Sequence, residues 1–166
     1  MVNIYLIGFM GSGKSSVGKE LATSLGVSFI DTDSYIEEVT QKSIPAIFAE
    51  QGEDGFRSHE SDALERLSTK EAVIATGGGI IEIPENKDIM TKNGIIVYLH
   101  TNFDTISKRL QEDENRPLWN QDLDKRKALY ERRLSLYRQF AHYVVETDDK
   151  EVETLIHELK GVIKSS

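Results

Sequence analysis

Residues 8–15 read Gly-Phe-Met-Gly-Ser-Gly-Lys-Ser, which matches the phosphate-binding pattern G-x-x-x-x-G-K-S. The preceding residues, 4–7, are apolar and β-prone, and residues 15–25 repeat apolar side chains at helical spacing. In this strand–loop–helix order the glycines let backbone N–H groups turn toward phosphate oxygens, and the N-terminus of the helix adds positive potential. The stretch therefore predicts a phosphate-binding loop at the start of an α/β domain.

Two side chains at the end of this loop carry the chemistry of the motif. Lys14 offers a mobile positive charge for the β and γ phosphates, and Ser15 offers a hydroxyl for a magnesium ion. A glycine-rich turn that meets the pattern by chance would not need the flanking strand and helix. We therefore expect the chain to bind a nucleoside triphosphate together with Mg²⁺.

Length, charge and composition limit the remaining possibilities. The chain has 166 residues, a net charge of −8 and no cysteine. The length suits one domain, and the negative charge argues against general affinity for nucleic acid or anionic membranes. No apolar run approaches the roughly 20 residues that cross a bilayer, and the first residues form a strand rather than a signal peptide. We expect a single domain over residues 1–166 that works as a monomer in the cytoplasm.

Apolar, β-branched runs alternate with helical patterns along the chain. The predicted strands lie near residues 3–7, 28–31, 72–76, 95–99 and 143–146. The predicted helices lie near residues 14–25, 34–51, 53–68, 85–93, 103–112, 123–141 and 149–163, with a break and restart at 43–45. Strands separated by helices indicate a parallel sheet covered on both faces, and ligands bind such sheets outside the carboxyl ends of the strands.

Two carboxylates follow the second predicted strand, at Asp31 and Asp33. Asp31 can reach a magnesium ion at the phosphate loop. Asp33, two residues further on, is free to face a hydroxyl of a substrate. A purely structural alternative is that one aspartate caps the next helix, since aspartate favours that position.

Two further motifs lie in the predicted helix near residues 53–68 and directly after the third predicted strand. Arg57 and Glu60 are three residues apart and share a helix face, which is usually a surface ion pair but in a cleft would let Arg57 bind a carboxylate. The triple glycine Gly77-Gly78-Gly79 follows the third strand. It could be a flexible turn, but bare backbone at the end of a buried strand favours close approach of a ligand.

Residues 108–138 carry more basic than acidic side chains, although the chain as a whole is acidic. Within them, residues 112–122 are mostly polar and resemble a mobile lid, with Arg116 beside Pro117. Phosphoryl transfer needs positive charge near the γ-phosphate and exclusion of water, and an arginine on a closing lid supplies both. Most of the other basic residues fit a solvated helix face.

Taken together, these motifs resemble the shikimate kinase family. The resemblance covers essentially the whole chain. It is carried by Gly-Phe-Met-Gly-Ser-Gly-Lys-Ser at 8–15, Asp31-Thr32-Asp33, Gly52-Glu53 with Phe56-Arg57 and Glu60, Gly77-Gly78-Gly79, Arg116-Pro117-Leu118, and Arg132-Arg133 with Leu136-Tyr137. The resemblance implies the nucleoside-monophosphate-kinase fold with a five-stranded parallel sheet. It also implies transfer of phosphate from ATP to the 3-hydroxyl of shikimate, in the biosynthesis of aromatic amino acids.

The resemblance also implies a role for individual residues. Asp33 would bind the shikimate hydroxyls and orient or deprotonate the attacking one, and the acceptor-binding segment would span about residues 32–60. Arg57 and Arg133 would clamp the carboxylate, and the spacing to Leu136-Tyr137 favours Arg133 over Arg132. Arg116 would contact the phosphates from the lid, and Arg109 would pack on adenine. The ATP phosphates would be held by Gly11, Ser12, Gly13, Lys14, Ser15 and Ser16, the magnesium ion by Ser15 and Asp31, and the acceptor also by Gly77, Gly78 and Gly79.

Two departures from the family pattern are visible. The loop ends Ser15-Ser16 where many members have Ser-Thr, and residues 147–152 lack the proline that often packs on adenine. Without the resemblance, the residues indicate only a small magnesium-dependent kinase with a compact anionic acceptor. Gluconate kinase or a nucleotide kinase is the alternative enzyme, and a nucleotide-binding switch is the alternative class. A switch would have no need of Arg57, Arg133 or Asp33.

Overall fold

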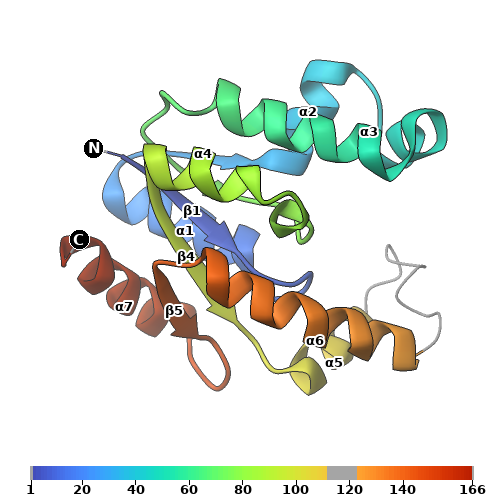
Figure 1. Cartoon of the computed structure of the whole chain (residues 1–166). Coiled ribbons are helices and arrows are strands. Elements are labelled where there is room, and N and C mark those ends of the chain that lie inside the picture. The colour runs from blue at the N-terminus through green and yellow to red at the C-terminus, as the bar shows by residue number, and fades with distance from the viewer. Residues whose placement is uncertain (1, 112–122, 166) are drawn as a thin grey trace.

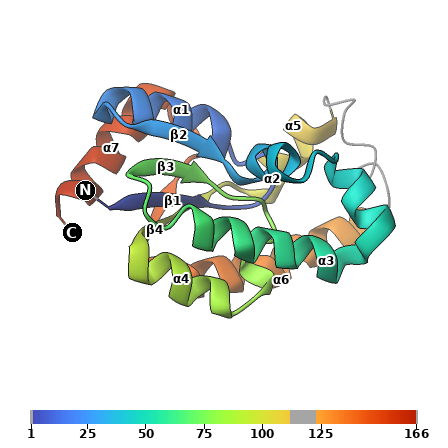
Figure 2. The ribbon, with the colours of Figure 1, turned by 90° about the horizontal axis from the view of Figure 1, so that it is seen from above.

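A five-stranded parallel sheet, in the order β2-β3-β1-β4-β5, runs through the middle of the computed structural model (Figures 1 and 2). The structure describes residues 2–111 and 123–165. The strands are β1 (Asn3–Ile7), β2 (Ser28–Asp31), β3 (Ala72–Ala75), β4 (Gly94–His100) and β5 (Tyr143–Glu146). The predicted parallel sheet of five strands is confirmed.

Helices cover both faces of the sheet (Figure 2). In β1, Ile4 and Leu6 face one layer while Tyr5 and Ile7 face the other, because successive side chains of a strand point to opposite sides. The first layer contains α1 (Lys14–Leu25) and α7 (Val152–Lys164). The opposite layer contains α3 (Ile44–Arg66), α4 (Glu85–Asn93), α5 (Phe103–Gln111) and α6 (Leu123–Phe140).

The connections on either side of β3 agree with the prediction except for one short element. The predicted break is confirmed, because α2 (Thr32–Thr40) ends before Gln41, which has a φ of 56°, and Ser43 then caps α3 by accepting a hydrogen bond from Ala46 N. The predicted boundary between helices at residue 52 is confirmed, because α3 consists of two helical segments joined at a kink, where Gly52 has a non-helical φ of 72° and ψ of −175°. The short helix η1 (Ile80–Glu82) was not predicted, because three residues carry no periodicity to detect.

Three of the predicted motifs meet at one edge of the sheet. The phosphate-binding loop follows β1, Asp31 ends β2, and the triple glycine follows β3. These strands are neighbours in the sheet and all run in the same direction, so their carboxyl ends lie together. The edge is tied across the strands by Thr76, whose hydroxyl donates to Leu6 O at 2.9 Å, and by Gly77 N, which donates to the Thr32 hydroxyl at 3.1 Å.

One property of the helices bears on membranes. Within residues 2–111 and 123–165, none of them combines the length and the apolar character needed to cross a bilayer.

Candidate active site

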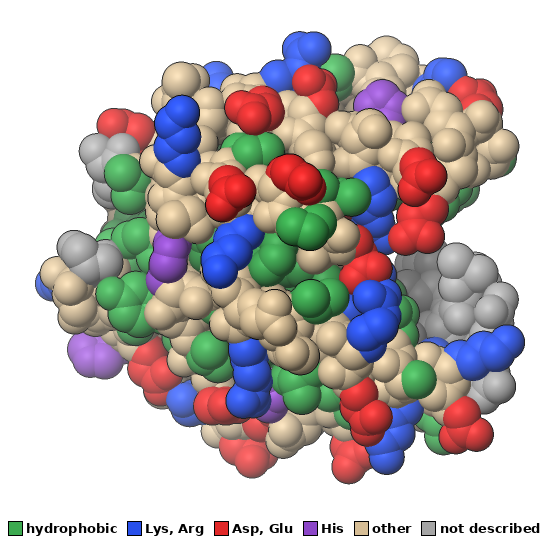
Figure 3. All heavy atoms as spheres, in the orientation of Figure 1, with side chains coloured by type: hydrophobic (Ala, Val, Ile, Leu, Met, Phe, Trp, Pro, Cys, Tyr) green, Lys and Arg blue, Asp and Glu red, His purple; other side chains and the backbone are tan. Residues whose placement is uncertain are grey.

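A cleft of about 240 Å³ opens at the carboxyl ends of β1, β2 and β3. Acidic and basic side chains gather around a hollow at the right of the surface in Figure 3. The cleft is lined by Met10, Gly11, Gly13, Lys14, Ser15, Ser16, Asp31, Asp33, Thr76, Gly77 and Gly78. The fold thus brings together residues from three separate sequence motifs.

The phosphate-binding loop has the backbone that its glycines were predicted to permit. Gly11 and Gly13 have φ values of 82° and 92°, which side-chain-bearing residues rarely adopt. Gly13 also caps α1, so the positive end of that helix faces the cleft. The ammonium group of Lys14 donates to Gly8 O at 2.6 Å and to Phe9 O at 3.1 Å, which holds it over the loop.

Asp31 both caps α2 and contacts Ser15, whereas the sequence alone did not decide whether Asp31 or Asp33 caps the helix. Its Oδ1 accepts a hydrogen bond from Ser34 N at 3.1 Å and caps α2, while its Oδ2 accepts from the Ser15 hydroxyl at 3.1 Å. The capping role considered for Asp33 therefore falls to Asp31. Ser15 and Asp31 present two hard oxygen atoms side by side, which is the donor chemistry that Mg²⁺ prefers.

Asp33 points into the cleft from the first turn of α2. Its Oδ1 is buried and accepts no hydrogen bond from the described residues. That oxygen lies 3.0 Å from the position a Cβ would take on Gly77. Burial, helped by the charge of Asp31 and opposed by that of Lys14, raises the pKa of Asp33 above its usual value. Asp33 is therefore a partly desolvated carboxyl with capacity to accept a hydrogen bond.

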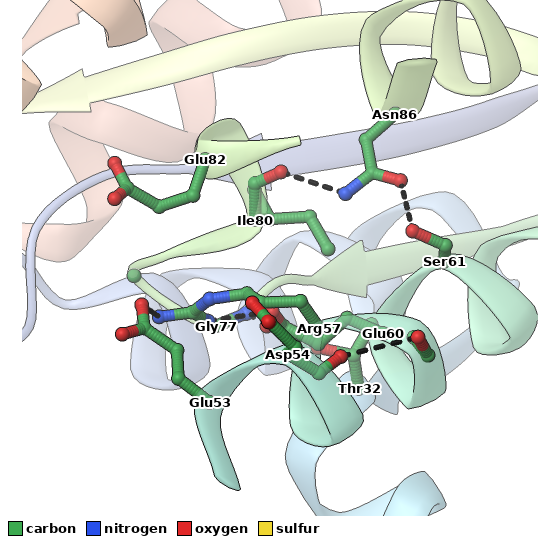
Figure 4. Close-up of polar contacts among 12 residues, drawn as sticks. Thr32, Glu53, Asp54, Arg57, Glu60, Ser61, Gly77, Ile80, Glu82 and Asn86 are labelled. Carbon is green, nitrogen blue, oxygen red and sulfur yellow. Dashed lines mark hydrogen bonds and ion pairs between the residues drawn. The ribbon is translucent and has the colours of Figure 1, made fainter. Parts of the chain in front are cut away.

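Arg57 and Glu60 form a buried pair rather than the surface ion pair that their spacing usually indicates. Arg57 is 9% exposed and Glu60 is fully buried. Arg57 Nη1 donates to Glu60 Oε1 at 2.6 Å, and Nη2 donates to Glu53 Oε1 at 3.3 Å, as Figure 4 shows beside Glu53. Burial raises the pKa of Glu60 to about 7, although the bond from Arg57 opposes the shift.

The triple glycine lies against these charged groups. A Cβ on Gly77 would lie 2.9 Å from Glu60 Oε2, and a Cβ on Gly79 would lie 2.4 Å from Arg57 Nη1 and Nη2. Both distances are shorter than the contacts that Cβ atoms make in proteins. A side chain at Gly77 or Gly79 would therefore displace the end of Glu60 or Arg57, so glycine at these two positions keeps both charged groups where they are.

The two neighbouring arginines of α6 differ in position. Arg133 is 8% exposed, and its Nη1 lies 3.5 Å from the position a Cβ would take on Gly78. The side chain of Arg132 is 55% exposed and donates to Glu82 Oε2 at 2.8 Å. The structure thus places Arg133, the residue favoured by spacing, at the triple glycine, and it places Arg132 at the surface. Glu82, which the sequence analysis did not single out, lies beside both.

The remaining predicted residues lie at or beyond the margin of the described site. Arg109 Nη1 donates to Gly11 O at 2.8 Å, so this side chain contacts the phosphate-binding loop. Arg116 and the predicted lid, residues 112–122, lie outside the described residues. In residues 2–111 and 123–165, no three His, Cys, Asp or Glu side chains are grouped as a metal site. A magnesium ion here would depend on Ser15, Asp31 and the oxygens of a bound phosphate.

Comparison with known proteins gives one consistent answer. The model of the family described as shikimate kinase matches residues 10–164. A shikimate kinase of Bacillus cereus strain AH187 is 44% identical over 164 residues, covering 98% of this chain and 99% of the relative. A solved structure of shikimate kinase from Acinetobacter baumannii in complex with shikimate is 41% identical and superposes with a TM-score of 0.90, covering 99% of this chain and 94% of that one.

A more distant likeness bears on the alternative enzyme. A gluconokinase from Sinorhizobium meliloti 1021 covers 99% of this chain and 94% of its own, with 18% identity and a TM-score of 0.62. At that identity the likeness shows a shared fold and carries no information about the acceptor.

Proposed function

The chain belongs to the shikimate kinase family, and we propose that the cleft transfers the γ-phosphoryl group of ATP to the 3-hydroxyl of shikimate. The products are shikimate 3-phosphate and ADP. The enzyme is a phosphotransferase with an alcohol as acceptor. The observation that carries the proposal is the buried Oδ1 of Asp33, which accepts no hydrogen bond within residues 2–111 and 123–165 and lines the same cleft as the phosphate-binding loop.

The nucleotide side of the cleft would position the phosphates. Backbone N–H groups of the loop and the N-terminus of α1 would hold the β and γ phosphates, with Lys14 exchanging its loop carbonyls for phosphate oxygens. Ser15 and Asp31 would hold Mg²⁺, and the described oxygens fit that ion. When bound, the ion would neutralise charge on the phosphates. Arg109 contacts the loop, and we propose that it also borders the nucleotide.

The acceptor side would orient the attacking oxygen. In phosphoryl transfer the new oxygen–phosphorus bond forms as the bond to the leaving ADP oxygen breaks, so the protein contributes mainly position and electrostatics. Asp33 would accept the hydrogen bond and then the proton of the 3-hydroxyl. Its raised pKa suits a group that must take up a proton near neutral pH. Arg57 and Arg133 would bind the carboxylate, and Gly77, Gly78 and Gly79 would leave room for the ring.

The segment over residues 112–122 completes the proposal. We propose that it is a lid that closes over the bound substrates and excludes water, and that Arg116 then contacts the phosphates. Protection of this segment from proteolysis by nucleotide and shikimate together would support the lid. Equal cleavage with and without substrates would contradict it.

An acceptor panel tests the function directly. ADP release would be followed in a coupled assay with ATP and Mg²⁺, using shikimate, gluconate and a nucleoside monophosphate in parallel. Because a site that hydrogen-bonds its substrate rejects unsuitable analogues strongly, kcat/KM for shikimate should exceed the others by about 10⁴. Phosphorus NMR of the product should place the phosphate on the 3-oxygen. Faster turnover of gluconate or of the nucleotide would overturn the acceptor, and ATP hydrolysis indifferent to every acceptor would favour the nucleotide switch.

We also propose that the protein works as a monomer in the cytoplasm. The absence of cysteine fits a reducing compartment. Light scattering after size-exclusion chromatography would test the first point, and cell fractionation would test the second.

A further inference from the structure

Glu82 places a carboxylate between the two neighbouring arginines of α6. We propose that Glu82 is a positioning residue of the acceptor site, which holds the guanidinium of Arg133 in the orientation that receives the carboxylate of the acceptor. This inference rests on the proposed function, because that function assigns Arg133 to the acceptor.

The contacts of Glu82 support this role. Its Oε2 accepts the bond from Arg132 Nη2 at 2.8 Å, and its Oε1 lies 3.9 Å from Arg133 Nε. The side chains of Glu82 and Arg133 are 16% and 9% exposed, respectively. Glu82 Oε1 and Arg133 Nε are both buried and make no hydrogen bond to any described residue. One edge of the Arg133 guanidinium therefore faces Glu82, while Nη1 faces Gly78 at the cleft.

The backbone beneath Glu82 is held in place by a buried amide. Asn86 is fully buried, donates to Ile80 O at 2.8 Å and accepts from the Ser61 hydroxyl at 2.7 Å (Figure 4). These bonds fasten η1, which carries Glu82, to α3. Ser61 lies one turn after Arg57 on α3, so both residues occupy the same face of that helix. Asn86 thereby fixes the distance between the element that carries Arg57 and the element that carries Glu82.

The charges around Glu82 keep it ionised. Burial acts to raise its pKa, but the hydrogen bond from Arg132 and the charges of Arg133, Arg132 and Arg57 outweigh burial, so the pKa is lowered. An ionised Glu82 has two opposite effects on an anionic acceptor. It repels the acceptor through space, and it orients Arg133 toward it. Whether KM for the acceptor rises or falls when the charge of Glu82 is removed separates these two effects.

The test is the variant Glu82→Gln, which removes the charge and keeps the size of the side chain. If orientation of Arg133 dominates, KM for shikimate should rise about three- to tenfold, the lower part of the range expected for coupled neighbours. The values of kcat and of KM for ATP should stay unchanged. A fall in KM would show that repulsion dominates, and an unchanged KM would show that Arg133 needs no such support. Either result overturns the inference.

A second variant guards against a simple charge effect. Glu82→Asp keeps the charge but withdraws it by one methylene, so KM for shikimate should again rise. The matched control is Asp62→Asn, which removes one negative charge from the exposed pair of Asp62 with Arg66, at 2.7 Å, and should change neither constant. An equal rise in KM for Asp62→Asn would assign the effect to net charge and overturn the inference.

Arg133→Ala separates this inference from the proposed function. Alone, it should raise KM for shikimate strongly, and adding Glu82→Gln to it should cause no further rise, because the residue that Glu82 positions is gone. If Arg133→Ala leaves KM unchanged, the assignment of Arg133 in the proposed function fails. If it raises KM but the effect of Glu82→Gln persists in the double variant, the further inference alone fails.

Discussion

Replacement of Gly79 by alanine tests whether the position of Arg57 controls acceptor binding. The backbone of Gly79, with φ of −97° and ψ of 12°, accepts alanine without strain. The added Cβ, however, would lie 2.4 Å from both Nη atoms of Arg57 and 2.5 Å from its Cζ. The guanidinium must move, because the clash falls on the end of a side chain rather than on backbone. In moving, it loses the alignment set by Glu60 at 2.6 Å and Glu53 at 3.3 Å.

The size of the effect follows from the contact that is lost. A charge-assisted hydrogen bond is worth about 1.5–3 kcal/mol, and each 1.4 kcal/mol is a factor of ten, so KM for shikimate should rise about ten- to a hundredfold. KM for ATP should change far less, because Arg57 does not line the phosphate-binding loop. The assay measures ADP release while the shikimate concentration is varied at saturating ATP, and then while the ATP concentration is varied at saturating shikimate.

Two further variants serve as controls for Gly79→Ala. Gly161→Ala adds the same methyl group where nothing lies within 4 Å of it, and should leave both constants unchanged. In an Arg57→Ala background, Gly79→Ala should add little, because the clash is gone. A folded Gly79→Ala protein with an unchanged KM for shikimate would refute the reasoning, since it would show that the described position of Arg57 is irrelevant to the acceptor.

Three other predictions test separate parts of the site. Lys14→Ala should lower kcat by about 10²–10³, as expected when a preorganised charge is removed from a transition state, and magnesium chelation should abolish turnover; robust activity in either case would exclude the kinase mechanism. Asp33→Asn should keep the fold and the affinity for ATP, measured by nucleotide titration, but lose turnover, because an amide cannot take up the proton; full activity would remove Asp33 from the chemistry. Glu60 has a pKa of about 7 in the folded protein against 4.5 for the free side chain, so folding retains a proton between these values. The stability that this proton provides is present below about pH 4.5 and is lost as pH rises through 7. The free energy of unfolding of the native protein should therefore fall, relative to that of Glu60→Gln, by up to about 3 kcal/mol across this pH range. Urea unfolding of both proteins measures the difference, and parallel pH profiles would contradict the assignment.

The sequence predicts this fold well because its signals are local. The strand, glycine-rich loop and helix at residues 3–25 lie next to one another in the chain, and the pattern that identifies them needs no partner from elsewhere. The break before α3 was visible for the same reason, because a serine cap followed by proline is a short-range signal. Membership of the shikimate kinase family was likewise predicted from motifs and confirmed by comparison, whereas the assignment of roles to individual residues stays a prediction.

Neither the burial of individual side chains nor their pairing with residues far along the chain could be predicted from the sequence. The spacing of Arg57 and Glu60 shows that they share a helix face, but not that the face is turned inward. The choice between Asp31 and Asp33 as the cap depends on how the chain leaves β2, which composition does not reveal. Glu82 gave no signal at all, because its partners Arg132 and Arg133 lie 50 residues or more along the chain and meet it only once α6 has packed on η1.

The place of β1 has a consequence for how the protein is made. Although β1 precedes the other four strands in the chain, it lies at the centre of the sheet, between β3 and β4, with Ile4 opposite Val73 on one side and Ile95 on the other. The phosphate-binding loop that follows it therefore has no framework until residues 72–100 have left the ribosome. Pairing between such distant segments slows folding, because a long loop must close before any contact rewards it. A nascent chain ending at residue 70 should accordingly remain open to protease, and the site should form late in synthesis, as a single event with the sheet.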